Sequence, residues 1–165
     1  ENKVQEAKTK FEELKTKYPN LELHLTGPLQ TNKTKEAIKL FDVFHTLDRE
    51  KLAKEFVRQG NLKNKKFFIQ VNTGKEENKS GIYLEHLDEF INYCRNDLSL
   101  NIVGLMCIPP INDTPQDHFS VLEKRAKKQN LKHLSMGMSN DYTEAIKHNA
   151  TYIRIGTLLF GKRDK

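Results

Sequence analysis

Apolar and polar positions follow one repeated pattern along the chain. Short apolar or β-branched runs are followed by a Gly, Asn, Pro, Ser or Asp break, and then by an amphipathic stretch of helix formers. The runs predict six strands, over residues 21–26, 43–47, 66–72, 101–108, 133–136 and 151–155. The amphipathic stretches predict helices over residues 33–41, 50–59, 84–97, 115–129 and 141–148, and the chain opens on a helix over residues 3–15. This strict alternation implies an α/β fold with a parallel sheet and right-handed crossovers.

Two α/β architectures fit the alternation, the open doubly wound sheet and the closed (β/α) barrel. No Gly-x-Gly-x-x-Gly turn follows any strand, which disfavours the dinucleotide-binding sheet. A complete barrel needs eight strands and roughly 200 residues or more, whereas this chain offers six strands in 165 residues and starts on a helix without an initiator Met. We therefore expect an incomplete (β/α)8 TIM-type barrel that lacks the first strand-helix unit and the second strand, in a piece of a longer protein.

Composition narrows the class of protein. With 36% apolar and 30% charged residues, and no Pro/Gly/Ser-rich linker, the chain predicts a single domain over residues 1–165. The apolar runs are far shorter than the ~20 residues of a membrane span. Cys94 and Cys107 have neither CxxC spacing nor a paired His, which argues against a disulfide scaffold or a zinc site. These features favour a soluble cytoplasmic protein without a metal site.

Candidate chemistry lies at the carboxyl ends of the last two predicted strands, where α/β folds place their functional groups. Ser139 follows the strand at 133–136, and we expect Asp141 and Glu144 to form a capping box on the next helix. Gly156 and Thr157 follow the final strand. Capping alone would explain either hydroxyl, but the pair at these two strand ends predicts a phosphate site, because backbone amides converge there on an anion.

Arg154 stands out because it lies inside the final strand. Alternation places Tyr152, Arg154 and Gly156 on one strand face, with Ile153 and Ile155 on the helix-covered face. Arg154 should therefore point into the barrel, where a guanidinium needs an acceptor because it cannot lose its charge. Either an internal salt bridge to a carboxylate or a ligand atom would serve, and the adjacent phosphate site favours the ligand.

Several motifs together resemble the bacterial pyridoxal phosphate homeostasis protein family, also called the YggS family, which is related to the N-terminal barrel of alanine racemase. The matching segments are residues 24–33 (HLTGPLQTNK), 71–72 (VN), 78–82 (NKSGI), 104–106 (GLM), 134–141 (LSMGMSND), 154–157 (RIGT) and 160–161 (FG). The resemblance spans essentially the whole chain. It implies a barrel of fold type III that binds pyridoxal 5′-phosphate (PLP), has no well-established catalytic turnover, and helps to balance vitamin B6 and amino-acid pools.

The resemblance also assigns residues. It places Ser139, Gly156 and Thr157 on the cofactor phosphate and Arg154 near the pyridine nitrogen. The opening Glu1-Asn2 with Val4-Gln5-Glu6 is similar to the family's Gly-Glu-Asn-x-x-Gln-Glu, so Asn2 joins the predicted site.

One departure concerns the lysine that holds the cofactor as an imine in this family, in a motif like Val-Ser-Lys. No lysine of the sequence matches it, so we expect that residue upstream of Glu1 and no catalytic residue in this chain. Lys33 and Lys79 belong to family motifs but are expected on surface loops.

Two other functions stay open at this point. The same phosphate site could serve a barrel enzyme that acts on a phosphorylated metabolite, or a racemase-like PLP enzyme. The net charge of +6 could draw nucleic acid, but Glu stands beside Lys in the helices and no aromatic-flanked basic motif occurs, so we expect no nucleic-acid partner.

Overall fold

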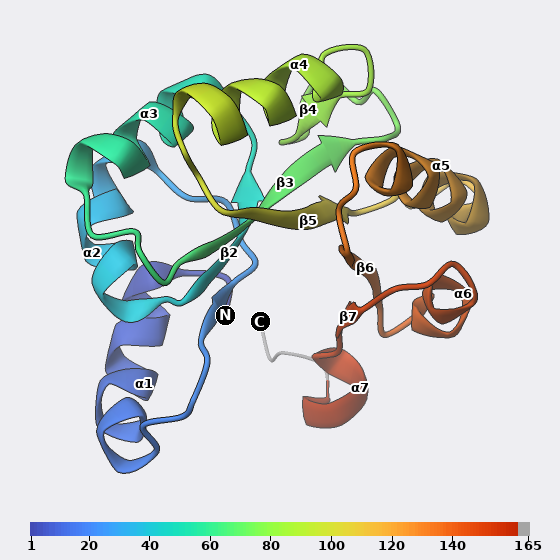
Figure 1. The fold of residues 1–165 in the computed structure, drawn as a ribbon. Helices are drawn as coiled ribbons and strands as arrows, with labels where there is room; N and C mark the ends of the chain where they lie inside the picture. Colours follow the sequence, from blue (N-terminus) through green and yellow to red (C-terminus); the bar gives the residue numbers. More distant parts are fainter. Residues whose placement is uncertain (162–165) are drawn as a thin grey trace.

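A single parallel sheet organises the molecule in a computed structural model, which describes residues 1–161. The strands follow one another in the order β1-β2-β3-β5-β6-β7, and all pairings among the described strands are parallel (Figure 1). They are β1 (His24–Leu25), β2 (Val43–Leu47), β3 (Lys66–Asn72), β5 (Ile102–Cys107), β6 (His133–Met138) and β7 (Tyr152–Arg154). A short strand, β4 (Ile82–Tyr83), pairs with β3 outside this order.

Helices connect the strands and cover the outer face of the curled sheet (Figure 1). They are α1 (Val4–Lys17), α2 (Thr34–Leu40), α3 (Glu50–Gln59), α4 (Leu87–Asn92), α5 (Pro115–Lys128), α6 (Tyr142–Lys147) and α7 (Thr157–Phe160), with a 3-10 turn at Thr31–Lys33 and a π-helical turn at Tyr93–Asp97. The main core lies between helices and sheet, where Phe56 of α3 packs edge-on against Phe44 and Phe67. None of the helices within residues 1–161 has the length and apolar character to cross a bilayer.

The inner face of the sheet carries a second, smaller apolar cluster. Val43, Phe68 and Met106 form it, with Val103 and Tyr152 packed against them. Strand alternation separates the two cores, since Phe44, Phe67 and Leu105 in the same strands belong to the outer core. Polar residues that share the inner face therefore lie inside the curl.

The curled sheet remains open between its first and last strands. Among residues 1–161, β1 pairs only with β2 and β7 only with β6, so the sheet forms part of a barrel wall. This architecture confirms the predicted incomplete (β/α) barrel and excludes the doubly wound alternative.

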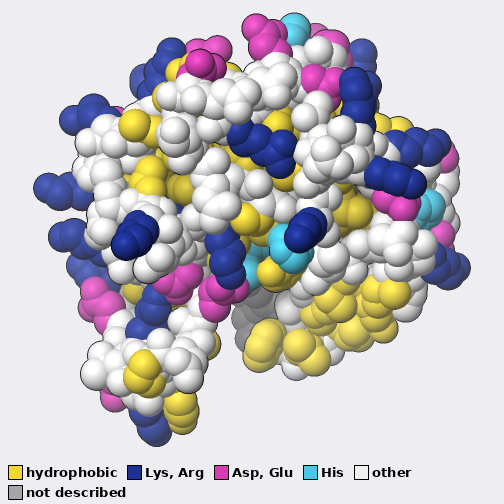
Figure 2. Space-filling model, viewed as in Figure 1, with side chains coloured by type: hydrophobic (Ala, Val, Ile, Leu, Met, Phe, Trp, Pro, Cys, Tyr) yellow, Lys and Arg dark blue, Asp and Glu magenta, His cyan; other side chains and the backbone are white. Residues whose placement is uncertain are grey.

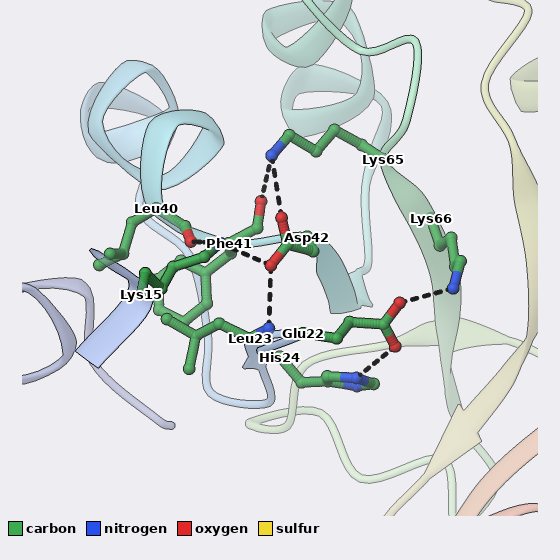
Figure 3. A network of polar contacts seen from close by, with 9 residues as sticks. All are labelled: Lys15, Glu22, Leu23, His24, Leu40, Phe41, Asp42, Lys65 and Lys66. Carbon is green, nitrogen blue, oxygen red and sulfur yellow. Dashed lines mark hydrogen bonds and ion pairs between the residues drawn. The ribbon is translucent and has the colours of Figure 1, made fainter. Parts of the chain in front are cut away.

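Several predicted boundaries were wrong. The first strand is two residues long instead of six, because the Asp42 carboxylate accepts the Leu23 N–H at 2.9 Å in place of a strand neighbour (Figure 3). The helix predicted over residues 84–97 begins at Leu87, since residues 82–83 pair with β3 as β4. Within α1 only Val4 and Ala7 are buried, whereas Leu14 is 38% exposed, so the helix packs on the core through its first half.

Candidate functional site

Ser139, Gly156 and Thr157 come together around the first turn of α7. Met138 pairs with Arg154 in the register of β6 and β7, which brings the segments after both strands side by side. The Ser139 hydroxyl then accepts the Leu158 N–H at 3.2 Å, linking the loop after β6 to α7. The sequence thus identified three residues that the fold places in one cluster.

This cluster offers hydrogen-bond donors to an outside ligand. The backbone N–H groups of Gly156 and Thr157, and the Thr157 hydroxyl, have no acceptor among residues 1–161. The space where a Gly156 side chain would lie is open, so a ligand can approach the backbone there. The Ser139 hydroxyl keeps its proton free to donate. Such a set of neutral donors suits an anion such as a phosphate.

Arg154 points inside the curl, as the alternation predicted. Its Nη1 donates to the Ser135 hydroxyl at 2.8 Å and its Nη2 to the Cys107 carbonyl at 2.9 Å. The internal salt bridge, the alternative to a ligand, is absent among the described residues, where both guanidinium bonds go to neutral oxygens. Burial lowers the pKa of the guanidinium, but a group with so basic an ordinary value stays charged. Since a guanidinium has five N–H donors, some remain for a ligand.

Asn2 lies at the opposite end of the strand order, beside the carboxyl end of β1. The Thr26 hydroxyl donates to Asn2 Oδ1 at 2.8 Å, and the Thr26 N–H donates to the Glu1 carbonyl at 2.9 Å. Gly27 permits this approach, because a Cβ there would come within 2.1 Å of the Asn2 carbonyl oxygen. The first two residues therefore run along β1 and carry Asn2 to the strand's carboxyl end.

The sequence did not single out the polar partners of Arg154 on the inner face. Ser135 is fully buried, and its hydroxyl also bonds His45 Nδ1 at 2.8 Å. His45 Nε2 in turn bonds His24 Nδ1 at 2.9 Å. His24 is a half-buried imidazole with both ring nitrogens hydrogen-bonded.

His45 is the most perturbed titratable group of this network. Burial lowers its pKa to about 3, and the nearby His24 and Arg154 charges act in the same direction. Its ring stacks on Phe68, with ring centres 4.3 Å apart. His45 is therefore neutral at physiological pH. The alternation that directs Arg154 into the barrel would also have predicted that His45 in β2 points inward.

Two local predictions near the site were wrong. Asp141 and Glu144 do not form a capping box: Asp141 Oδ1 accepts the Met138 N–H, while Glu144 Oε2 pairs with Lys147 at 2.8 Å. Asp141 thus fastens the end of β6 in place of capping α6. Ile153 was expected under a helix but is 40% exposed, because β7 lies at the edge of the sheet.

The cysteine thiols and the motif lysines take no part in this site. Cys94 and Cys107 are free and buried, and burial raises the pKa of each thiol to about 12. Lys33 lies 3.9 Å from Glu36 on the surface, and Lys79 is exposed in the loop after β3. No cluster of His, Cys, Asp and Glu within residues 1–161 is arranged to hold a metal ion.

The motif after β3 has a structural explanation. The Asn72 side chain donates to the Glu76 carbonyl at 2.8 Å and accepts the Glu76 N–H at 3.1 Å. Gln70 holds the other end of the same loop through the Ser80 carbonyl. These contacts shape the loop at residues 73–81, and none of them involves Ser139, Gly156 or Thr157.

Comparison with known proteins shows the family and the fold. The family model of the alanine racemase N-terminal domain matches residues 1–164. A pyridoxal phosphate homeostasis protein of Aquifex aeolicus (strain VF5) is 42% identical over 99% of this chain and 75% of its own length. PipY of Synechococcus elongatus PCC7942, in its structure with PLP bound, superposes with a TM-score of 0.84 at 34% identity, over 97% of this chain and 79% of PipY. Alanine racemase from Corynebacterium glutamicum shares the fold with a TM-score of 0.71, at 13% identity over 98% of this chain and 46% of the racemase.

The fold and the donor cluster define an alanine racemase-like partial barrel with a group of free hydrogen-bond donors at its carboxyl edge. The chain belongs to the alanine racemase N-terminal domain family and, within it, to the pyridoxal phosphate homeostasis proteins. The resemblance read from the motifs is thereby confirmed.

Proposed function

We propose that this chain binds pyridoxal 5′-phosphate at the carboxyl ends of β6 and β7 and serves vitamin B6 homeostasis. The observation that carries the proposal is the donor set of Ser139, Gly156, Thr157 and Arg154. It combines free N–H and O–H groups around α7 with the half-buried, charged guanidinium of Arg154, two positions before Gly156. An anionic phosphate joined to a ring with an acceptor nitrogen matches these two kinds of donor.

Each residue has a distinct part in the proposed site. The Gly156 and Thr157 amides and the Ser139 and Thr157 hydroxyls would hold the phosphate. Arg154 would donate to the ring nitrogen and keep it unprotonated, because a fixed cation disfavours a second positive charge beside it. Asn2 would line the site from the β1 side. When bound, the cofactor supplies a reactive aldehyde and an electron-withdrawing ring, which an unprotonated nitrogen weakens.

A weak electron sink suits a protein that holds or carries its cofactor without efficient turnover. We accordingly propose that the chain acts as a PLP-binding regulatory protein of the cytoplasm, as one domain over residues 1–165. The names of its relatives and the PLP-bound structure of PipY support this function. Lys33 and Lys79, the lysines of the family motifs, lie at the surface, so we expect neither to form an imine with the cofactor and binding by this chain to be reversible.

The test is a PLP titration of the wild-type chain and a Thr157→Leu variant, followed by absorbance and equilibrium dialysis. Loss of the hydroxyl and crowding at the amide should weaken PLP binding by about tenfold, the effect of one charge-assisted hydrogen bond. Thr16→Leu, at an exposed position in α1, is the matched control and should bind as the wild type does.

Three results would count against the proposal. Equal PLP affinity of Thr157→Leu and Thr16→Leu would show that the phosphate does not bind at this cluster. Stoichiometric labelling of Lys33 or Lys79 after borohydride reduction would show a covalent site elsewhere in the chain. A phosphorylated metabolite without a pyridine ring that bound as tightly as PLP would favour the alternative of a barrel enzyme.

A further inference from the structure

A continuous line of hydrogen bonds crosses the inner face of the sheet and ends on Arg154. Lys66 Nζ bonds Glu22 Oε2 at 2.6 Å, and Glu22 Oε1 bonds His24 Nε2 at 2.9 Å (Figure 3). From His24 the line continues through His45 and Ser135 to the guanidinium, in steps of 2.9, 2.8 and 2.8 Å. Lys66 opens β3 and Arg154 closes β7, so the line joins the amino edge of the sheet to its carboxyl edge.

The chemistry of the two ends fixes the direction of every bond between them. An ionised Glu22 can only accept, and Arg154 can only donate. Neutral His24 must therefore carry its proton on Nε2, facing Glu22, which leaves Nδ1 as an acceptor. His45 then carries its proton on Nε2 and accepts at Nδ1, and the only hydrogen left for that bond is the hydroxyl proton of Ser135. The Ser135 oxygen remains free to accept from Arg154.

The surroundings keep this arrangement in place near neutral pH. The side-chain bond from Lys66 is the main cause that lowers the pKa of Glu22, while burial lowers the pKa of His24 and of His45. The charged or titratable groups around the two rings are Glu22, Lys66, the amino group of Glu1, Arg154, and the ring neighbours Tyr152 and His133. Among them Glu22 alone carries a negative charge, and it lies at the accepting end.

We propose that Glu22, His24, His45 and Ser135 form a one-way hydrogen-bond relay that positions the Arg154 guanidinium at the carboxyl edge. In this role they are positioning residues, and their action on the cofactor rests on the proposed PLP function. With Ser135 committed to accept from Arg154 and to donate to His45, the hydroxyl has no proton to offer a ligand. Arg154 is then the donor that faces the cofactor ring.

The relay has one alternative state, which needs one additional proton. If Glu22 takes up a proton, it can donate to His24 Nε2. The protons of His24 and His45 then move to Nδ1, and the Ser135 oxygen accepts from both His45 and Arg154. The Ser135 hydroxyl keeps its proton but no longer donates it to His45. A change at the exposed amino edge would thus reach Arg154 at the carboxyl edge without movement of the backbone.

The first experiment measures histidine tautomers in the ligand-free, 15N-labelled chain by long-range 1H–15N correlation at neutral pH. We expect the Nε2–H tautomer for both His24 and His45. Glu22→Gln should populate the second tautomer of each ring, because an amide can donate as well as accept. Glu50→Gln, which removes an exposed carboxylate paired with Lys54 on α3, is the matched control and should change neither ring. An Nδ1–H tautomer on His45 of the wild type would overturn the relay.

The second experiment compares ligands. Ser135→Ala should weaken PLP binding by about tenfold, the effect of one lost bond to a charged group, and should leave the affinity for inorganic phosphate within twofold. Ser135→Thr retains the hydroxyl and should restore most of the PLP affinity. Equal losses for both ligands, or no rescue by threonine, would contradict a positioning role. If wild-type PLP binding itself fails, the proposed function fails, while the tautomer spectra still decide the relay.

Discussion

His45 shows how a single buried residue makes stability depend on pH. It is 1% exposed and surrounded by Phe68, His24 and Ser135. Its folded pKa of about 3 lies below the value of about 6.5 expected in the unfolded chain. At a pH between these two pKa values, His45 binds a proton in the unfolded state but not in the folded state. The stability contributed by neutral His45 is thus complete above about pH 6.5 and is lost as the pH falls toward 3.

We therefore expect acidification from pH 7 to 5 to destabilise the wild type by roughly 2 kcal/mol more than a His45→Phe variant. The measurement is urea unfolding at each pH. The variant is less stable at neutral pH, since His24 and Ser135 lose a partner, so the change with pH is the informative quantity. His86→Phe, at an exposed position before α4, is the control and should retain the pH dependence of the wild type. Parallel pH profiles for wild type and His45→Phe would refute a neutral, buried His45.

At the scale of elements, the packing of β6 against α6 depends on Gly137. Its φ is +90°, in the region that favours glycine. A Cβ there would lie 2.6 Å from the Ala145 Cβ and 3.0 Å from the Tyr142 Cα, both in α6. The close approach of this helix fixes the loop that carries Ser139.

Gly137→Ala should accordingly lower the free energy of unfolding by about 2–4 kcal/mol, from overpacking together with backbone strain. Gly156→Ala is a matched comparison, because Gly156 has a negative φ and open space around it. That variant should unfold as the wild type does in thermal or urea denaturation, although its Cβ would occupy the proposed ligand approach. Equal stability of Gly137→Ala and the wild type would show that α6 can move away from β6 at little cost.

The elements also show how far a sequence predicts a fold. The apolar runs that became β2 and β3 are long and clearly bounded, so their limits were predicted correctly. β4 was missed because two residues are too few to show a period. Alternation alone was enough to predict that Arg154 points inward. Its partners could not be identified, because the bond between His45 and Ser135 joins residues 90 positions apart and exists only when the sheet curls.

For the whole molecule, the open sheet and an apolar patch dominate the expected behaviour. β1 and β7 are edge strands within the described residues. Close to β7, Leu158, Leu159 and Phe160 are 60%, 70% and 85% exposed, and apolar side chains gather over this part of the surface (Figure 2). Unpaired strand edges next to an apolar surface favour association between chains.

We expect the purified 165-residue chain to associate in sedimentation velocity experiments, increasingly with concentration, through the surface around α7. Phe160→Lys should shift the distribution toward the monomer, because a charge on this surface must lose its hydration in any contact that buries it. Ile111→Lys is the matched control: Ile111 is 96% exposed in the loop after β5, so its replacement puts the same charge in place of another exposed apolar side chain, outside the α7 patch. If the wild type sediments as a monomer at every concentration and unfolds in one cooperative transition, the open edges and the α7 patch do not govern its solution state. If Ile111→Lys reduces association as much as Phe160→Lys does, the effect comes from charge alone and the α7 surface is not the contact.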